Sequence, residues 1–268
     1  MRVWLAALGA ILLYGSIRFA VSRLIFRPTR YPRGWWHTQA EFGAQDVWLR
    51  SSDGVRLHAW WVAVPASSRL ATLYLHGNGA NLSHRPGHLR EMIGAGSSVL
   101  VIDYRGYGKS AGRPTERGLY RDASAGYDHL IAMGYRPEQI VVHGESLGSA
   151  VAADLAARRP CAGLVLECPL TSLSEMAGRI VPWVGRWFAG GFHTRRNVSR
   201  LHVPLLVIHG DRDRVVPHAM GRAVFAAGNQ PKSFFSVPGA THRTIVDSAG
   251  PRYRAELRAF YEALPVNR

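Results

Sequence analysis

Three residue types that together perform nucleophilic acyl transfer occur in separate segments of this 268-residue chain. Ser146 lies at the centre of GESLG, residues 144–148, which is a G-x-S-x-G pattern. A serine hydroxyl is a weak nucleophile at neutral pH, so it needs a histidine base and a carboxylate that orients the histidine. A segment with two aspartates, Asp211 and Asp213, follows Ser146, and His242 comes after it. The order Ser, Asp, His predicts a catalytic triad on an α/β sheet.

The residues on either side of Ser146 are typical of a sharp turn between a strand and a helix. EQIVVH, before the turn, has the composition of a buried strand, and SLGSAVAADLAARR, after it, that of a helix. Glycines at 144 and 148 permit the tight turn that would expose the Ser146 hydroxyl above the sheet. The helix N-terminus favours negative charge that develops beside the serine.

Short apolar runs alternate with helical segments along the rest of the chain. Such runs, without polar alternation, indicate strands buried on both faces. The first two strands are joined by Ser52-Asp53-Gly54, a hairpin turn signal, so an antiparallel edge begins the sheet. We therefore expect one α/β domain with a doubly wound, mostly parallel sheet. The expected strands are QDVWLRS, VRLHAWWVAV, LATLYLHG, SSVLVIDYR, EQIVVHG, AGLVLEC, VPLLVIHG and KSFFSVPG, and the expected helices are His84–Gly94, Glu116–Met133, Leu147–Arg158, Pro217–Ala227 and Arg252–Leu264.

From position 46 to the C-terminus the chain resembles the α/β-hydrolase superfamily. Four segments carry the resemblance: HGNGAN at 76–81, DYRGYGKS at 103–110, the turn at Ser146, and HGDRD at 209–213 followed by Val216-Pro217. Within the superfamily it is similar to short-lidded, N-terminally membrane-anchored serine hydrolases with a serine aminopeptidase S33-like, hydrolase-4-like domain. The resemblance implies an α/β-hydrolase fold with a short helical lid, no cofactor and no metal.

The resemblance also implies particular site residues. The H-G-x-x-D pattern places the acid at Asp213, with Asp211 and Glu167 as the alternatives. The final histidine falls on His242, although Thr241 stands where relatives often have glycine. The backbone N–H groups of Leu147 and Asn78 are the expected oxyanion donors. His76, His143 and His209 end strands beside glycine, and we expect them to be buried, hydrogen-bonded structural groups.

The segment 169–201 is too long for an ordinary connection and is expected to be a lid insertion. Its apolar side chains include Trp183, Trp187 and Phe188, which we expect to line an acyl-binding surface over Ser146. The alternative is a helix that merely covers the sheet.

The N-terminal segment VWLAALGAILLYGSI, residues 3–17, contains no charge and is followed by arginines at 18, 23, 27, 30 and 33. We expect residues 1–33 to be a single-pass membrane anchor with a basic flank, and residues 34–268 to be the hydrolase domain, placed in the cytoplasm by the positive-inside rule. Fifteen helical residues reach only about 22 Å. A cleaved signal peptide and a core helix are therefore the alternatives.

The formal charge of +15 does not by itself predict nucleic-acid binding. All but two of the 33 basic residues are arginine, and no aromatic-and-basic motif accompanies them. Two cysteines cannot form a disulfide framework or a four-thiolate zinc site. Neither a P-loop nor a dinucleotide fingerprint is complete around Lys109, so no nucleotide cofactor is expected.

The sequence thus predicts a metal-independent serine hydrolase of carboxylic esters or thioesters with apolar acyl groups, in the esterase, lipase or thioesterase class. Small-molecule or lipid substrates and a membrane are the expected partners, without nucleic acid. The alternatives are a serine aminopeptidase or amidase on the same site, a catalytically silent, membrane-tethered binding protein, and a basic protein recruited by anionic polymers.

Overall fold

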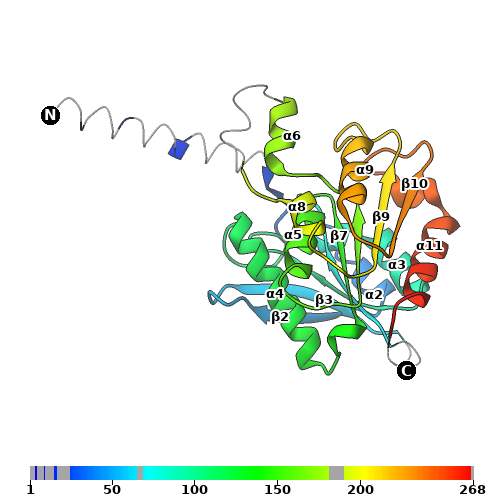
Figure 1. The fold of residues 1–268 in the computed structure, drawn as a ribbon. Helices are drawn as coiled ribbons and strands as arrows, with labels where there is room; N and C mark the ends of the chain where they lie inside the picture. Colours follow the sequence, from blue (N-terminus) through cyan, green and yellow to red (C-terminus); the bar gives the residue numbers. More distant parts are fainter. Residues whose placement is uncertain are drawn as a thin grey trace.

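A mostly parallel sheet of eight strands forms the centre of the molecule, in the strand order β10-β9-β8-β7-β4-β6-β3-β2 (Figure 1). The computed structural model describes residues 25–64, 69–180 and 190–266, together with Trp4, Gly9, Gly15 and Ser16. β2 and β3 form the expected hairpin at one edge, and β3 also pairs antiparallel with β6. All other neighbours in this sheet are parallel. The sequence-predicted fold class is therefore confirmed.

The strands lie where apolar runs predict them. β4, β6 and β8 are buried along their whole length because helices cover both faces of the sheet. The strands of the large sheet are β2 (Gln45–Arg50), β3 (Arg56–Val62), β4 (Ala71–Leu75), β6 (Ser98–Ile102), β7 (Ile140–Glu145), β8 (Gly163–Glu167), β9 (Leu205–Gly210) and β10 (Lys232–Val237).

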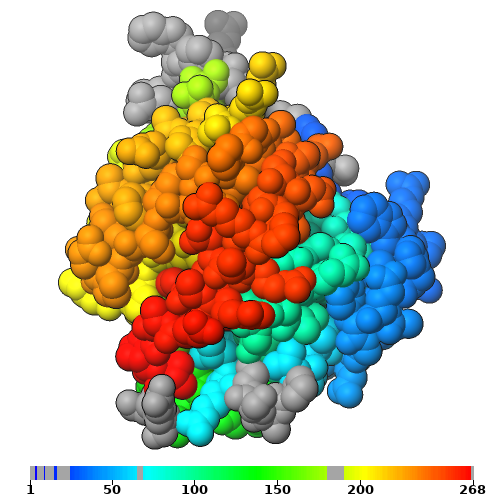
Figure 2. Space-filling view, turned by 90° about the vertical axis from the view of Figure 1, so that its right-hand side faces the viewer, coloured from blue at the N-terminus to red at the C-terminus, as the bar shows by residue number. Residues whose placement is uncertain are grey.

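Helices cover the two faces of the sheet and make a three-layer molecule. α4, α5, α8 and α9 pack with one apolar core, whereas α3, α10 and α11 pack with the other. Figure 2 faces the second of these layers, where the C-terminal helices lie beside the blue-green segment that contains α3. The helices are α2 (Thr38–Glu41), α3 (Pro86–Gly94), α4 (Glu116–Ala132), α5 (Leu147–Ala156), α6 (Leu173–Ile180), α8 (Thr194–Val198), α9 (His218–Ala227), α10 (Ile245–Ala249) and α11 (Pro251–Glu262), with short 3-10 turns η1 (Leu82–His84) and η2 (Pro137–Gln139).

A small second sheet joins a strand of the N-terminal part of the chain to the loop after β4. β1 (Arg27–Pro28) pairs in parallel with β5 (Gly79–Ala80), in the loop that follows β4. The Arg30 guanidinium donates to the backbone oxygens of Gly106 and Gly112, at 3.2 and 2.9 Å. The segment from residue 25 onward is therefore packed against the loops that follow β4 and β6.

The expected single-pass membrane anchor is wrong on this structure. Within the ranges described, no helix is both long enough and apolar enough to cross a bilayer. The longest of them, α4, has 17 residues and carries charges such as Arg121 and Asp122, whereas a span needs about 20 predominantly apolar residues. Most of the segment 3–17, on which that expectation rested, lies outside the described residues.

Candidate active site

Ser146 occupies a strained turn between β7 and α5. Its φ of 52° and ψ of −116° are unusual for a residue with a side chain. The flanking glycines explain how the turn closes: a Cβ on Gly144 would lie 2.3 Å from the Gly148 oxygen, and one on Gly148 would lie 1.9 Å from the Leu75 oxygen. The Ser146 N–H donates to the Glu167 backbone oxygen at 2.8 Å, which ties the turn to β8.

His242 lies between the other two sequence-predicted residues. Its Nε2 is 3.0 Å from the Ser146 Oγ, and its Nδ1 is 2.7 Å from the Asp213 Oδ2. An ionised carboxylate only accepts hydrogen bonds, so Nδ1 carries the proton and Nε2 is left as the acceptor for the serine hydroxyl. The structure thus brings Ser146, His242 and Asp213 into one hydrogen-bonded chain.

The Asp213 carboxylate is held on both oxygens. The N–H groups of Val215 and Val216 donate to its Oδ1 at 2.8 and 2.9 Å, while Oδ2 receives His242. Burial alone would raise the pKa of Asp213, but contacts from His209 and His242 outweigh it and hold the pKa well below its usual value. Asp213 is therefore a fixed anion next to the imidazole.

The two alternative acids have other partners. The Glu167 carboxylate lies 3.0 Å from the His88 Nε2 and accepts from the Tyr253 hydroxyl at 2.6 Å. The Asp211 Oδ1 accepts the Gly239 N–H at 2.7 Å. Both carboxylates stabilise their own surroundings rather than orient His242.

Thr241, which stands where relatives often have glycine, is accommodated by a local cap. Its N–H donates to the Thr244 Oγ1 at 3.0 Å, and the two hydroxyls are 3.1 Å apart. The turn that presents His242 therefore closes through side-chain hydrogen bonds instead of a glycine conformation.

The two expected oxyanion donors flank the serine. Leu147 is the first residue of α5, so its N–H has no acceptor within the helix. Asn78 lies in the loop after β4, and a Cβ on its neighbour Gly77 would be 3.4 Å from the Ser146 Cβ. The structure places the HGNG loop directly beside the serine.

Sequence reasoning missed the elements that hold this loop. The side-chain Nδ2 of Asn78 donates to the Ile25 backbone oxygen at 2.9 Å. The backbone oxygen of Asn78 accepts from the Arg27 N–H at 3.0 Å and from the Tyr107 hydroxyl at 2.8 Å. The three partners come from two distant segments, residues 25–27 and the loop around Tyr107. Only the RGYG motif around Tyr107 offered a signal in the sequence.

A partly buried ion pair next to the serine was also missed. The Arg85 Nε donates to the Glu145 Oε2 at 2.6 Å, and Arg85 reaches the Gly79 oxygen at 3.2 Å. The Tyr74 hydroxyl also donates to Glu145, at 2.7 Å. Burial opposes ionisation of Glu145, but the charge of Arg85 prevails and lowers its pKa. Arg85 thereby links the turn at Ser146 to the HGNG loop.

The expected structural histidines are all fully buried, and one departs from the prediction. His76 and His209 each make a hydrogen bond to a backbone oxygen. His143 has none at either ring nitrogen, and burial lowers its pKa to about 4. A neutral ring packed edge-on against Tyr74 accounts for its environment.

Trp183, Trp187 and Phe188, the expected acyl-binding residues, lie outside the described residues. The insertion returns to the domain at Phe192, which is buried and packs against Phe26 with ring centroids 6.3 Å apart. The Phe192 N–H donates to the Glu116 Oε1 at 2.7 Å.

Within the described ranges, Cys168, His209 and Asp213 have side-chain atoms within 4.8 Å of one another, a spacing at which a metal ion could be held. The His209 Nε2 is already 2.9 Å from the Val216 oxygen, and both Asp213 oxygens are engaged as described above. The cluster as it stands positions Asp213.

Fold and site together define an α/β hydrolase. The chain matches the family described as Hydrolase_4, serine aminopeptidase S33, over residues 66–195 and 188–249. It is 37% identical over 243 residues to protein Rv2307c of Mycobacterium tuberculosis, covering 88% of this chain and 86% of that one. It is 32% identical over 218 residues to alpha/beta hydrolase domain-containing protein 17B of Homo sapiens, covering 79% and 74%. The chain belongs to the Hydrolase_4 (S33) family.

Solved structures share the fold at lower sequence identity. The esterase Pf2001 of Pyrococcus furiosus superposes with a TM-score of 0.73 and 22% identity, covering 89% of this chain and 99% of that one. An alpha-beta hydrolase from Vibrio vulnificus gives a TM-score of 0.70 and 24% identity, covering 84% and 83%. At these identities the likeness establishes the fold.

Proposed function

We propose that this protein is a serine hydrolase that cleaves carboxylic esters or thioesters through an acyl-enzyme intermediate. The observation that carries the proposal is the hydrogen-bonded chain from Ser146 through His242 to Asp213, at 3.0 and 2.7 Å. A serine hydroxyl that is hydrogen-bonded to an imidazole, itself held by a buried carboxylate, is the arrangement that makes serine nucleophilic.

The reaction follows from the roles of these atoms. The Ser146 Oγ attacks the acyl carbonyl carbon while the His242 Nε2 takes the hydroxyl proton. The carbonyl oxygen becomes an oxyanion, which the N–H groups of Leu147 and Asn78 stabilise. The imidazolium then protonates the leaving alcohol or thiol, and the acyl group stays on Ser146. Water, deprotonated by His242, attacks this ester; the bond to the Ser146 Oγ breaks, the imidazolium returns the proton to that oxygen, and the acid is released.

The apolar residue that directly follows the serine, Leu147, supports an apolar acyl group. Leu147, Tyr107 and Phe192 belong to one buried cluster, which Phe26 joins from the N-terminal segment. We assign the catalytic unit to residues 34–268, with residues 25–33 packed onto it as a support for the HGNG loop. We assign the insertion at 169–201 to the wall or cover of the acyl site. The description of the family as serine aminopeptidases makes an amide substrate the second candidate.

Turnover of a matched substrate panel tests the proposal. p-Nitrophenyl esters with acyl chains of two to twelve carbons are compared with an acyl thioester and an aminoacyl p-nitroanilide, using wild type and Ser146→Ala. We expect ester or thioester turnover that rises with chain length and disappears in the variant. Faster turnover of the anilide would favour the peptidase instead, and no Ser146-dependent turnover on any substrate would contradict the hydrolase.

A further inference from the structure

The His76 imidazole holds the peptide unit whose N–H is the second oxyanion donor. Its Nδ1 lies 2.8 Å from the Gly77 oxygen. A carbonyl oxygen only accepts, so Nδ1 carries the proton. The Gly77 carbonyl and the Asn78 N–H belong to one planar trans peptide unit and point in opposite directions. Holding the carbonyl at one end therefore fixes the direction of the N–H at the other.

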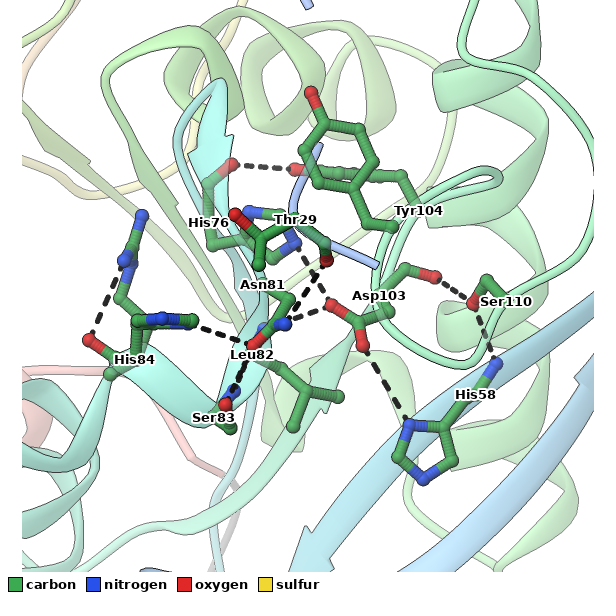
Figure 3. A network of polar contacts seen from close by, with 12 residues as sticks. Thr29, His58, His76, Asn81, Leu82, Ser83, His84, Asp103, Tyr104 and Ser110 are labelled. Atoms are coloured by element: carbon green, nitrogen blue, oxygen red, sulfur yellow. Dashed lines mark hydrogen bonds and ion pairs between the residues drawn. The ribbon is translucent and has the colours of Figure 1, made fainter. Parts of the chain in front are cut away.

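Asp103 lies beside the His76 imidazole, on the side of its Nε2. Both side chains are fully buried, and the Asp103 Oδ1 is 3.5 Å from the His76 Nε2. The same oxygen accepts the Leu82 N–H at 2.8 Å, at the start of η1, where the loop ends. Figure 3 shows Asp103 between His76 and His58, with Leu82 alongside. Asp103 thus holds the far end of the loop through a hydrogen bond and lies beside the ring without one.

Two tyrosines complete the cage around the imidazole. The ring centroids of Tyr104 and Tyr107 lie 4.7 and 5.2 Å from that of His76. The Tyr104 hydroxyl donates to the His76 backbone oxygen at 3.2 Å, while the Tyr107 hydroxyl holds the carbonyl of Asn78. The peptide units on both sides of Asn78 are therefore held, and the imidazole packs against two aromatic rings.

We propose that His76 is a positioning residue for the oxyanion hole, which aims the Asn78 N–H through the hydrogen bond from its Nδ1 to the Gly77 carbonyl. The inference rests on the proposed function, because it concerns the direction of a donor used in that reaction. The Asn78 N–H contributes when the oxyanion forms, so a loss of its positioning by His76 should lower kcat more than it changes KM.

Two amide substitutions separate the two ring nitrogens. In His76→Asn the side-chain nitrogen can occupy the place of Nδ1 and still donate to the Gly77 carbonyl. In His76→Gln the nitrogen reaches the place of Nε2, toward Asp103, and that donor is lost. Both variants remove the ring, so a merely structural role would affect them alike. Thermal unfolding of each variant reports its folding separately.

We expect kcat on a p-nitrophenyl ester to fall about 100-fold in His76→Gln with KM within about 3-fold of wild type, as for loss of one oxyanion donor. His76→Asn should retain at least about 10-fold more of the wild-type kcat than His76→Gln. Equal losses of kcat in the two variants, or a higher kcat in His76→Gln than in His76→Asn, would overturn the proposal.

A second measurement does not depend on turnover or on the variants folding. ¹⁵N NMR of the wild-type imidazole, with His76 assigned through the backbone, should show a protonated Nδ1 whose hydrogen exchanges slowly. An unprotonated Nδ1 would overturn the inference. A wild-type protein with no turnover but a protonated Nδ1 would contradict the hydrolase assignment while leaving the hydrogen bond to Gly77 established.

Discussion

The His242 Nε2 lies 3.0 Å from the Ser146 Oγ although 96 positions separate the two residues. The distance is short because β7 and β10 run parallel in one sheet and therefore deliver the segments after their carboxyl ends to the same edge. Asp213 reaches this edge from β9, between them in the chain. Parallel topology thus converts a large separation in sequence into one hydrogen-bonded chain.

Asp213 should be required for turnover and Asp211 should not. Asp213→Asn keeps the size of the side chain but presents an amide to His242, which favours the wrong tautomer. We expect kcat to fall by about 10⁴-fold on a p-nitrophenyl ester. The matched control is Asp211→Asn, two positions earlier, where the carboxylate accepts a hydrogen bond from the Gly239 N–H. The kcat of this control should stay within about 3-fold of wild type. A larger loss of kcat in Asp211→Asn than in Asp213→Asn would mean that Asp211 orients His242.

Gly148 should tolerate no side chain. Its Cβ would lie 1.9 Å from the backbone oxygen of Leu75, which cannot move without displacing β4. We expect Gly148→Ala to lower the free energy of unfolding by about 3 kcal/mol or to prevent folding. The control is Gly190→Ala, where a Cβ would meet nothing within 4 Å. Chemical denaturation compares the two, and equal stability would show that the turn at Ser146 is not close-packed.

The Arg85–Glu145 pair should make stability depend on pH in acid. Glu145→Gln leaves the partly buried Arg85 without its carboxylate, so we expect a loss of about 2 kcal/mol in the free energy of unfolding at pH 7. The pKa of Glu145 is lower in the folded state than its usual 4.5. The unfolded chain then binds more protons as the pH falls.

The contribution of Glu145 is therefore fully present above pH 4.5 and is lost as the pH falls below that value. Urea denaturation at pH 7, 5, 4 and 3 should give a shallower decline for Glu145→Gln than for wild type. Parallel declines in the two proteins would mean that Glu145 is not the group that titrates.

The sheet and the three residues at its edge were predictable because each has a local signature. Apolar runs mark the strands, glycines mark the turn at Ser146, and the parallel order determines which strand ends meet. The choice of Asp213 over Glu167 depended on the family pattern, because a carboxylate at a strand end has no local property that reveals its partner. In the structure the Glu167 carboxylate is already engaged by the side chains of His88 and Tyr253.

The supports of the site could not be predicted, because they join distant segments by single contacts. β1 is two residues long and exists only through its pairing with β5, so no periodicity announces it. Arg85 and Glu145 are 60 positions apart, and no sequence pattern predicts that these two side chains meet. The membrane expectation came from the lack of charge in residues 3–17, a property that short apolar segments share whether or not they span a bilayer.

Covalent labelling of the intact protein tests the central claim most directly. A fluorophosphonate reacts with a serine only when a base activates its hydroxyl, and peptide mapping by mass spectrometry identifies the modified residue. We expect one adduct per chain, on Ser146, which is lost in Ser146→Ala and greatly slowed in His242→Ala while both variants remain folded. An unlabelled wild type, or an adduct that persists in Ser146→Ala, would contradict the account.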